Sequence, residues 1–166
     1  DLCVQLAANM IYLGEKADTI EKAVEMAEKS IADGSALIKL MEMVKAQGGD
    51  ASYIENTGKF SLSKVRYEVK SNTSGYITYI NAESCGFAAV ELGAGREKKD
   101  SVIDFGAGII LEKNTDDSVN VGDTLAVLYA DTLEKCKAAE EIILAAIGFG
   151  GEKPKAHTAI FDRIEL

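Results

Sequence analysis

The spacing of apolar residues changes its period once along this chain, from helical before residue 50 to alternating after residue 62. Before that point, apolar residues recur every three to four positions, which is typical of amphipathic helices. After it, Val65, Tyr67 and Val69 alternate with charged residues, which is typical of a half-buried strand. The succession of the two patterns predicts an α+β protein in which helices precede a mixed domain.

Residues 2–15 are predicted to form a helix with apolar side chains on most of its faces. Leu2, Leu6, Met10 and Leu13 form one stripe at helical spacing. A helix that is apolar on most sides requires burial on most sides. We therefore expect this helix to need neighbours that the chain itself does not supply.

Two further helices are predicted before residue 50. Asp18 followed by Glu21 indicates a capping box at the start of the second helix, and Gly34 is a suitable stop. The third helix is expected over 35–47. The side chains predicted to face inward from these helices are Ile20, Val24, Ala27, Ile31, Leu37, Leu40, Met41 and Val44.

Residues 51–61 lack periodicity and are predicted to be a connection, which leaves 1–50 as a helical segment and 62–166 as a separate domain. Within that domain we predict strands at 65–70, 76–80, 107–112, 124–130 and 158–164, and helices at 82–92 and 131–147. Asp131 and Glu134 indicate a capping box for the last helix. Its predicted inward side chains are Leu133, Cys136, Ile143 and Ile147.

The composition argues against several classes of binding protein. The chain has 27 acidic and 18 basic residues and no dense cluster of cations, which argues against a nucleic-acid or anionic-membrane surface. Cys3, Cys85 and Cys136 lie far apart and His157 is the one histidine, so no structural metal site is predicted. Unpaired thiols favour a cytoplasmic location, and no apolar run approaches the roughly 20 residues of a membrane span.

Three stretches together resemble pyrimidine-nucleoside (thymidine) phosphorylases. Residues 6–50 end in AQGGD and are similar to the late helices of that family. The run SGYITYI at 74–80 is similar to the strand that follows the family's connection. Residues 88–130 resemble its C-terminal motif, in which LGAGR precedes a charged stretch, Ile-Asp, a Gly-Ile strand and a Gly-Asp turn. Each motif is weak alone, but their order and spacing make the resemblance specific.

The resemblance implies a transferase that reversibly cleaves a pyrimidine nucleoside with phosphate to the free base and a pentose 1-phosphate. It implies that 1–50 are the tail of an α/β domain and that 62–166 are the C-terminal domain, with a barrel-like sandwich sheet. It also implies a homodimer in nucleotide salvage. The chain begins with Asp1 rather than Met, so we expect a processed or truncated polypeptide.

The phosphate- and base-binding motifs of that family have no match in these residues. We therefore predict no catalytic, phosphate-binding, base-binding or metal-ligating residue here, no cofactor, and an architectural role, with phosphate as co-substrate of the intact enzyme. Gly93 to Arg96 could form an anion-binding nest, but a tight turn after the 82–92 helix is the favoured interpretation. His157 lacks a catalytic partner at local motif spacing and is interpreted as an ordinary surface or sheet-edge histidine.

Two other functions fit part of the sequence. Residues 74–130 resemble half of a biotinyl or lipoyl carrier domain, in which Lys113 would be the modified lysine. However, neither Met-Lys-Met nor Asp-Lys surrounds Lys113. A protein-interaction module is the other alternative. Ligase-dependent acylation would distinguish a carrier from a phosphorylase domain.

Overall fold

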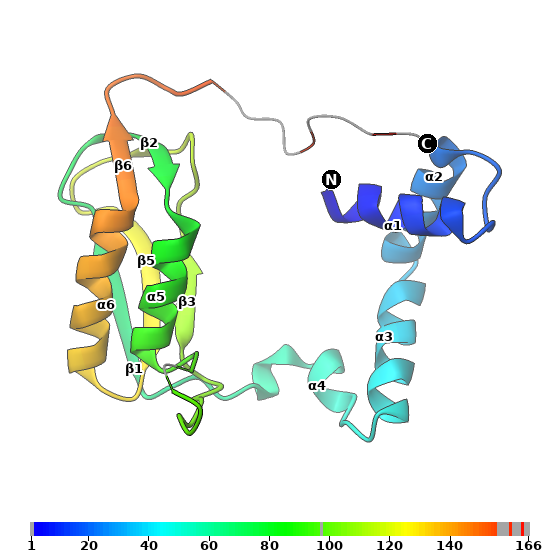
Figure 1. The fold of residues 1–166 in the computed structure, drawn as a ribbon, viewed down its shortest axis with the longest axis horizontal. Helices are drawn as coiled ribbons and strands as arrows, with labels where there is room; N and C mark the ends of the chain where they lie inside the picture. Colours follow the sequence, from blue (N-terminus) through cyan, green and yellow to red (C-terminus); the bar gives the residue numbers. More distant parts are fainter. Residues whose placement is uncertain (1, 97, 156–159, 161–163, 165–166) are drawn as a thin grey trace. The chain divides into compact units, whose positions relative to one another are not determined.

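The computed structural model describes residues 2–96, 98–155, 160 and 164, and these divide into two compact units (Figure 1). The first unit extends through Lys59 and the second begins at Phe60. The first contains α1 (Leu2–Leu13), α2 (Ile20–Ala32), α3 (Ser35–Ala46), α4 (Ser52–Glu55) and a 3₁₀ turn, η1 (Thr57–Lys59). The assignment of 1–50, 51–61 and 62–166 to the regions of a phosphorylase stays a prediction.

The buried residues described in the first unit are all alanines. Ala8 on α1 and Ala23 and Ala27 on α2 are buried, and small side chains of this kind let the two helices pack closely. The predicted inward stripe of α3 is only partly correct, because Met41 and Val44 are half-buried whereas Leu37 and Leu40 are exposed. On α2, Ile31 is also exposed. The physical reason is that the neighbouring helices of this unit cover only part of each apolar face.

The predicted capping boxes are displaced by one residue. Thr19, not Asp18, is the N-cap of α2, and its Oγ1 accepts the Lys22 N–H at 3.3 Å. Thr19 has extended backbone angles, which direct its side chain back to the first turn. Asp18 lies one residue outside and forms an ion pair with the Lys22 ammonium at 3.1 Å. The same arrangement recurs at the start of α6, with Thr132, Asp131 and Lys135.

The predicted featureless connection contains the two short turns α4 and η1. Asp50 Oδ1 accepts the Ser52 N–H at 2.9 Å, and Asn56 Oδ1 accepts the Gly58 N–H at 3.0 Å. Aspartate and asparagine side chains commonly stabilise turns by accepting the N–H two residues ahead. The sequence signal for these turns was therefore a side chain that accepts a nearby backbone N–H, rather than a periodic pattern of apolar residues.

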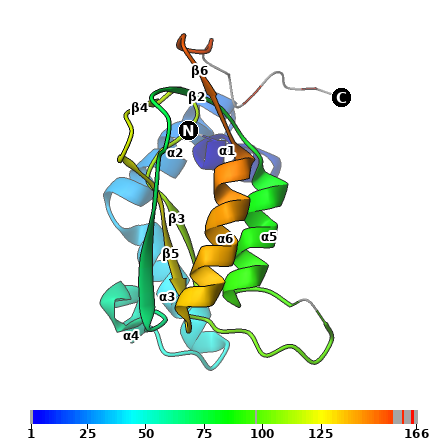
Figure 2. The ribbon, with the colours of Figure 1, turned by 90° about the vertical axis from the view of Figure 1, so that its left-hand side faces the viewer.

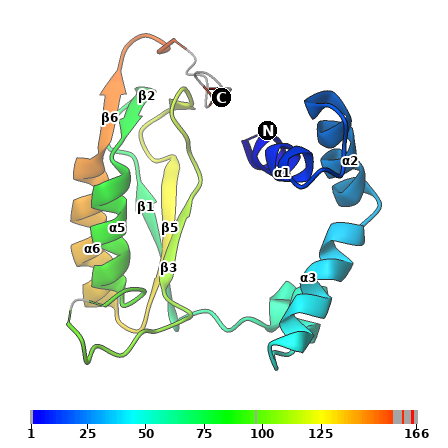
Figure 3. The same cartoon turned by 45° about the vertical axis from the view of Figure 1, so that its right-hand side comes forward.

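The described residues of the second unit form two three-stranded antiparallel sheets and two helices (Figures 2 and 3). The first sheet has the order β1-β5-β3 and the second has the order β4-β2-β6. The elements are β1 (Val65–Lys70), β2 (Gly75–Ile80), α5 (Ala82–Leu92), β3 (Gly108–Leu111), β4 (Ser118–Val119), β5 (Thr124–Ala130), α6 (Leu133–Ala146) and β6 (Ile147–Gly150). The α+β class is confirmed. The described strands do not close into a barrel, so that detail is not confirmed.

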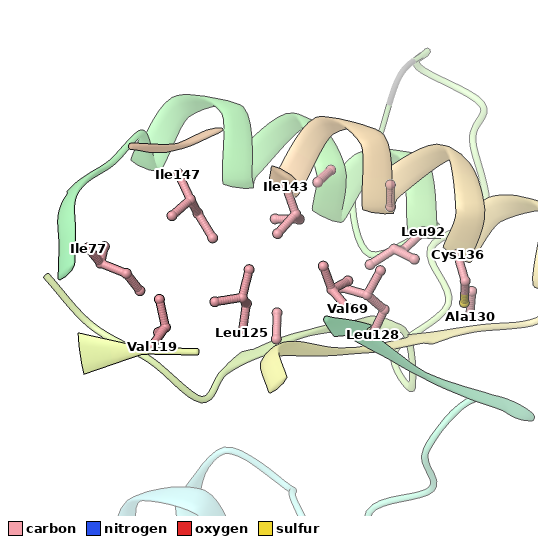
Figure 4. Close-up of a cluster of buried hydrophobic side chains, with 13 residues drawn as sticks. Val69, Ile77, Leu92, Val119, Leu125, Leu128, Ala130, Cys136, Ile143 and Ile147 are labelled. Atoms are coloured by element: carbon pink, nitrogen blue, oxygen red, sulfur yellow. The ribbon is translucent and has the colours of Figure 1, made fainter. Parts of the chain in front are cut away.

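The core lies between the helix pair and the strands (Figure 4). Leu125 and Leu128 of β5, Val69 of β1, Leu92 of α5 and Ile143 of α6 are fully buried there. Strand β5 is central in its sheet, and nearly all its side chains are buried. Such burial on both faces explains why its sequence is a continuous apolar run.

The predicted inward face of α6 is only partly correct. Cys136 and Ile143 are buried as predicted, and so is Ile147, although it follows the helix as the first residue of β6. Leu133 is exposed. It is the first residue of the helix, so no preceding helical turn covers it.

The strand β6 was not predicted, because its glycines resemble breaks in the chain. It pairs antiparallel with β2. A Cβ on Gly150 would lie 2.8 Å from Thr78 Cγ2, and one on Gly75 would lie 2.6 Å from the Gly150 carbonyl oxygen. The glycines therefore allow the two strands to approach each other. The strand predicted at 158–164 falls almost wholly outside the described residues.

Glycine at position 86 makes a testable contribution to stability. Gly86 lies inside α5, is exposed, and has no heavy atom within 4 Å of the position of an added Cβ. Gly86→Ala should raise the free energy of unfolding by about 0.5–1 kcal/mol, because alanine loses less backbone entropy in a helix. Urea denaturation of both variants measures this. A decrease in stability would contradict the conclusion that there is free space for a methyl group at position 86. Gly150→Ala, which adds the same methyl group in a crowded place, should instead destabilise the fold.

Candidate functional site

The glycine-rich segment 93–96 ends helix α5. Gly93 has a φ of 101° and is the left-handed C-cap of that helix. Its N–H donates to the Val90 carbonyl at 2.9 Å, and the Ala94 N–H donates to the Ala89 carbonyl at 2.9 Å. Because these two N–H groups already have acceptors, the segment forms the predicted turn, and those donors are not available to a bound anion.

Glycine at position 95 is required by close packing. A Cβ there would lie 2.7 Å from Val90 Cγ2. Arg96 follows it and is exposed. The ion pairs found among the described residues do not include Arg96.

Asp104 joins three segments around that turn. One carboxylate oxygen accepts the Ser63 hydroxyl, and Oδ1 accepts the Gly106 N–H at 2.9 Å. The Asp104 N–H donates to the Gly93 carbonyl at 3.0 Å. The Ser63 hydroxyl, followed by the Gly106 N–H, holds the pKa of Asp104 below its usual value. With both oxygens occupied, this carboxylate is suited to fixing the loop rather than to accepting a substrate proton.

A shallow groove lies on the strands β1, β3 and β5 and their flanking turns. It has a volume of about 360 Å³ and is lined by Arg66, Glu68, Glu112, Lys113, Asp123, Thr124 and Val127. Glu68 forms ion pairs with Lys70 at 2.6 Å and with Arg66 at 2.7 Å. The lining carries both signs of charge, which does not favour a particular ionic ligand.

The ion pairs of Glu68 predict a pH dependence of stability. Lys70, then Arg66, lower the pKa of Glu68 from 4.5 to about 2. The charged form is therefore favoured in the folded state. Its contribution to stability is fully present above the unfolded pKa, about 4.5, and is lost as the pH falls through about 2.

We expect the free energy of unfolding of the wild type to fall more steeply between pH 5 and pH 2 than that of Glu68→Gln. The difference should be small and should shrink in 1 M salt, because Arg66 and Lys70 are exposed to solvent and Glu68 is only half-buried. Urea titrations at several pH values measure it. Parallel pH profiles of the two variants would show that the pairs contribute nothing. Glu42→Gln, which removes an exposed helical ion pair to Lys39, is the matched control.

Lys113, the carrier candidate, does not project freely from a hairpin tip. Its side chain is half-buried, and Nζ donates to the Ser118 carbonyl at 3.4 Å, a long contact. It lines the groove described above. A swinging arm needs an exposed lysine, so this position offers no support for the carrier interpretation.

The remaining candidate residues are scattered. Cys3 is exposed, Cys85 is half-buried and Cys136 is buried, and burial raises the pKa of the Cys85 and Cys136 thiols. His157 lies outside the described residues. Within the described part of the chain, no three His, Cys, Asp or Glu side chains gather as metal ligands, and no helix is long and apolar enough to cross a membrane. The absence of catalytic and ligand-binding residues stays a prediction.

The sequence did not predict that Asp104 would connect the segments of this region. Its partner Ser63 is 41 residues away in sequence, so no local pattern joins them. A weaker signal was present, since aspartate two residues before glycine favours a turn closed by the carboxylate. Asp104 and Gly106 have that spacing.

Comparison with known proteins gives consistent matches. Residues 76–150 match the family described as "Pyrimidine nucleoside phosphorylase C-terminal domain". The chain is 37% identical over 164 residues to a pyrimidine-nucleoside phosphorylase of Geobacillus stearothermophilus, which covers 99% of this chain and 38% of the relative. A Bacillus subtilis protein of the same name is 36% identical over 131 residues, 79% of this chain and 30% of that relative.

The matched residues thus span 38% of the length of the first relative and 30% of the second. The matched residues 76–150 run from β2 to β6 and include the Gly93 turn, Asp104 and most of the buried core. The chain therefore belongs to the pyrimidine-nucleoside phosphorylase family and carries the C-terminal domain of that family.

Proposed function

We propose that this chain is the architectural C-terminal part of a phosphorylase that reversibly cleaves pyrimidine nucleosides with phosphate. The products would be the free base and a pentose 1-phosphate. The observation that carries the proposal is the 37% identity to a pyrimidine-nucleoside phosphorylase along 164 residues. The intact enzyme would be a cytoplasmic homodimer of nucleotide salvage that uses phosphate as co-substrate and no other cofactor.

The architectural role is supported by the hydrogen bonds around the Gly93 turn, where the backbone donors and the carboxylate already have partners within the chain. A phosphate-binding site needs cations or backbone N–H groups that converge on the anion. The N–H groups of Gly93 and Ala94 donate to helix carbonyls, and the Asp104 carboxylate is engaged by two donors. The chain would thus support the wall of the active-site cleft and its closure, while residues elsewhere in the enzyme perform the chemistry.

Phosphorolysis assays on two proteins test this proposal. The complete reading frame that encodes these residues should release thymine from thymidine or uracil from uridine, and only with phosphate present. The isolated 166-residue chain should release neither. Turnover by the isolated chain that survives repurification would overturn the architectural role. A complete protein inactive on both nucleosides would overturn the phosphorylase assignment.

The same preparation separates the phosphorylase from the carrier alternative. After co-expression with biotin and lipoate ligases, the intact mass of the chain should be unchanged. A stoichiometric increase that Lys113→Arg abolishes would favour a carrier domain. The half-buried position of Lys113 is the reason to expect no increase.

A further inference from the structure

Two large apolar side chains of the α5–β3 connection are almost fully exposed. Phe105 is 94% exposed and Val102 is 92% exposed, the highest values among the large hydrophobic side chains of the described residues. Leu62, which precedes β1, is exposed as well. A single exposed apolar residue on a mobile loop needs no explanation, so the question is whether Phe105 is held in place.

The backbone on both sides of Phe105 is fixed. Asp104 is held by the Ser63 hydroxyl and the Gly93 carbonyl, as described above. The Gly106 carbonyl accepts the Ser63 N–H at 3.0 Å, and the Ala107 N–H donates to the Asp104 carbonyl at 3.1 Å. A Cβ on Gly106 would lie within 2.9 Å of backbone atoms of residues 61–63, so the two segments are in direct contact.

These contacts place a phenyl ring in solvent on a backbone that is already ordered. Residues that dominate protein interfaces are often aromatic, and an anchor that is ordered before binding loses less entropy on association. The backbone of residues 61–63, which carries the exposed Leu62, is in direct contact with the backbone next to Phe105. Held by these backbone contacts, the Phe105 ring is not covered by apolar side chains of its own unit.

We propose that Phe105, together with the exposed Val102 and Leu62, is an anchor that inserts into an apolar recess in the part of the phosphorylase outside this chain. The inference rests on the proposed function. The chain spans only 38% of the Geobacillus relative, so most of such an enzyme lies outside these residues and can supply the recess. The connection also carries Arg96, Lys98 and Lys99 interspersed with Glu97 and Asp100, so charges of both signs at the rim of the recess would be complementary.

Tryptophan quenching tests the proposal directly. The chain contains no tryptophan, so Phe105→Trp introduces a single probe. Acrylamide should quench it strongly in the isolated chain. In the complete protein, the fluorescence that the introduced tryptophan adds to the wild-type emission should shift to shorter wavelength. The acrylamide quenching constant of that added fluorescence should fall several-fold. Val121→Trp, at another exposed apolar position in a turn, should stay strongly quenched in both proteins.

A second measurement covers the case in which tryptophan does not fit the recess. Loss of an interface anchor commonly costs 2 kcal/mol or more, which corresponds to about a 30-fold change in an equilibrium constant. In the complete protein, Phe105→Ser should therefore accelerate hydrogen exchange of residues 98–107 by about 30-fold. In the isolated chain the same substitution should change nothing.

The outcomes are distinct from those of the activity assay, because neither readout requires turnover. Equal, strong quenching of Phe105→Trp in both proteins, with exchange of 98–107 unaffected by Phe105→Ser, would overturn the anchor. Protection of the probe in the isolated chain would overturn it too, since the ring would then be covered by the chain itself. An inactive complete protein that buries the probe would overturn the phosphorylase assignment alone.

Discussion

Replacing Leu128 with alanine should lower the free energy of unfolding of the second unit by about 2–5 kcal/mol. Leu128 is fully buried on β5, the central strand of its sheet, and belongs to the cluster that includes Val69, Leu92 and Ile143. The substitution removes apolar contacts and leaves a cavity, because strands and helices on both sides of the core can relax only partly.

Urea denaturation followed by circular dichroism measures the loss, with the slope of the transition checked for two-state behaviour. Leu62→Ala is the matched control, since it removes the same atoms from an exposed side chain. In the isolated chain it should change stability by no more than about 0.5 kcal/mol. Equal effects of the two substitutions would contradict the assigned core.

Leu6→Glu should convert an oligomer of the isolated chain into a monomer. Leu2, Leu6, Met10 and Leu13 remain exposed on α1, and Met10 is 69% exposed. An apolar face of this kind usually associates with another surface. Burial of each such side chain contributes about 1.5–3 kcal/mol. A contact that covers the face on both copies can therefore exceed the cost of association, about 4–15 kcal/mol.

Size-exclusion chromatography with light scattering on both variants measures the oligomeric state. A buried carboxylate is costly to desolvate, so Leu6→Glu should prevent the contact while leaving the second unit folded. Gln5→Glu adds one negative charge on the same helix at a polar position and serves as control. A monomeric wild type whose first helix is strongly protected from hydrogen exchange would contradict the prediction.

The elements best predicted from sequence are those whose own residues contain the whole signal. β1 alternates in hydrophobicity, β5 is a continuous apolar run between turns, and both were placed within a residue or so. Helix starts were less certain, because Asp18 and Thr19 are both good caps and periodicity cannot choose between them. Burial of the helical stripes was predicted only in part, because it depends on which surfaces cover each stripe.

The region around Asp104 depends on contacts that a linear pattern does not contain. The resemblance drew attention to the glycines at 93 and 95, and the turn predicted there is present. The carboxylate that secures this turn was not identified, because the residues that Asp104 contacts come from the C-cap of α5, from the residues before β1 and from the turn before β3. Only the folded chain brings those three segments together.

Helix α6 runs into strand β6 without a connecting residue, since one ends at Ala146 and the other begins at Ile147. Each residue turns a helix by about 100°, whereas each residue in a strand exchanges the two faces of the sheet. A single inserted or deleted residue between Cys136 and Ile147 would thus rotate one end of the helix away from the core or shift β6 against β2. Insertions and deletions in this segment should be strongly selected against during evolution, even where individual side chains vary. The α5–β3 connection differs, because its residues between Arg96 and Asp104 can change in number.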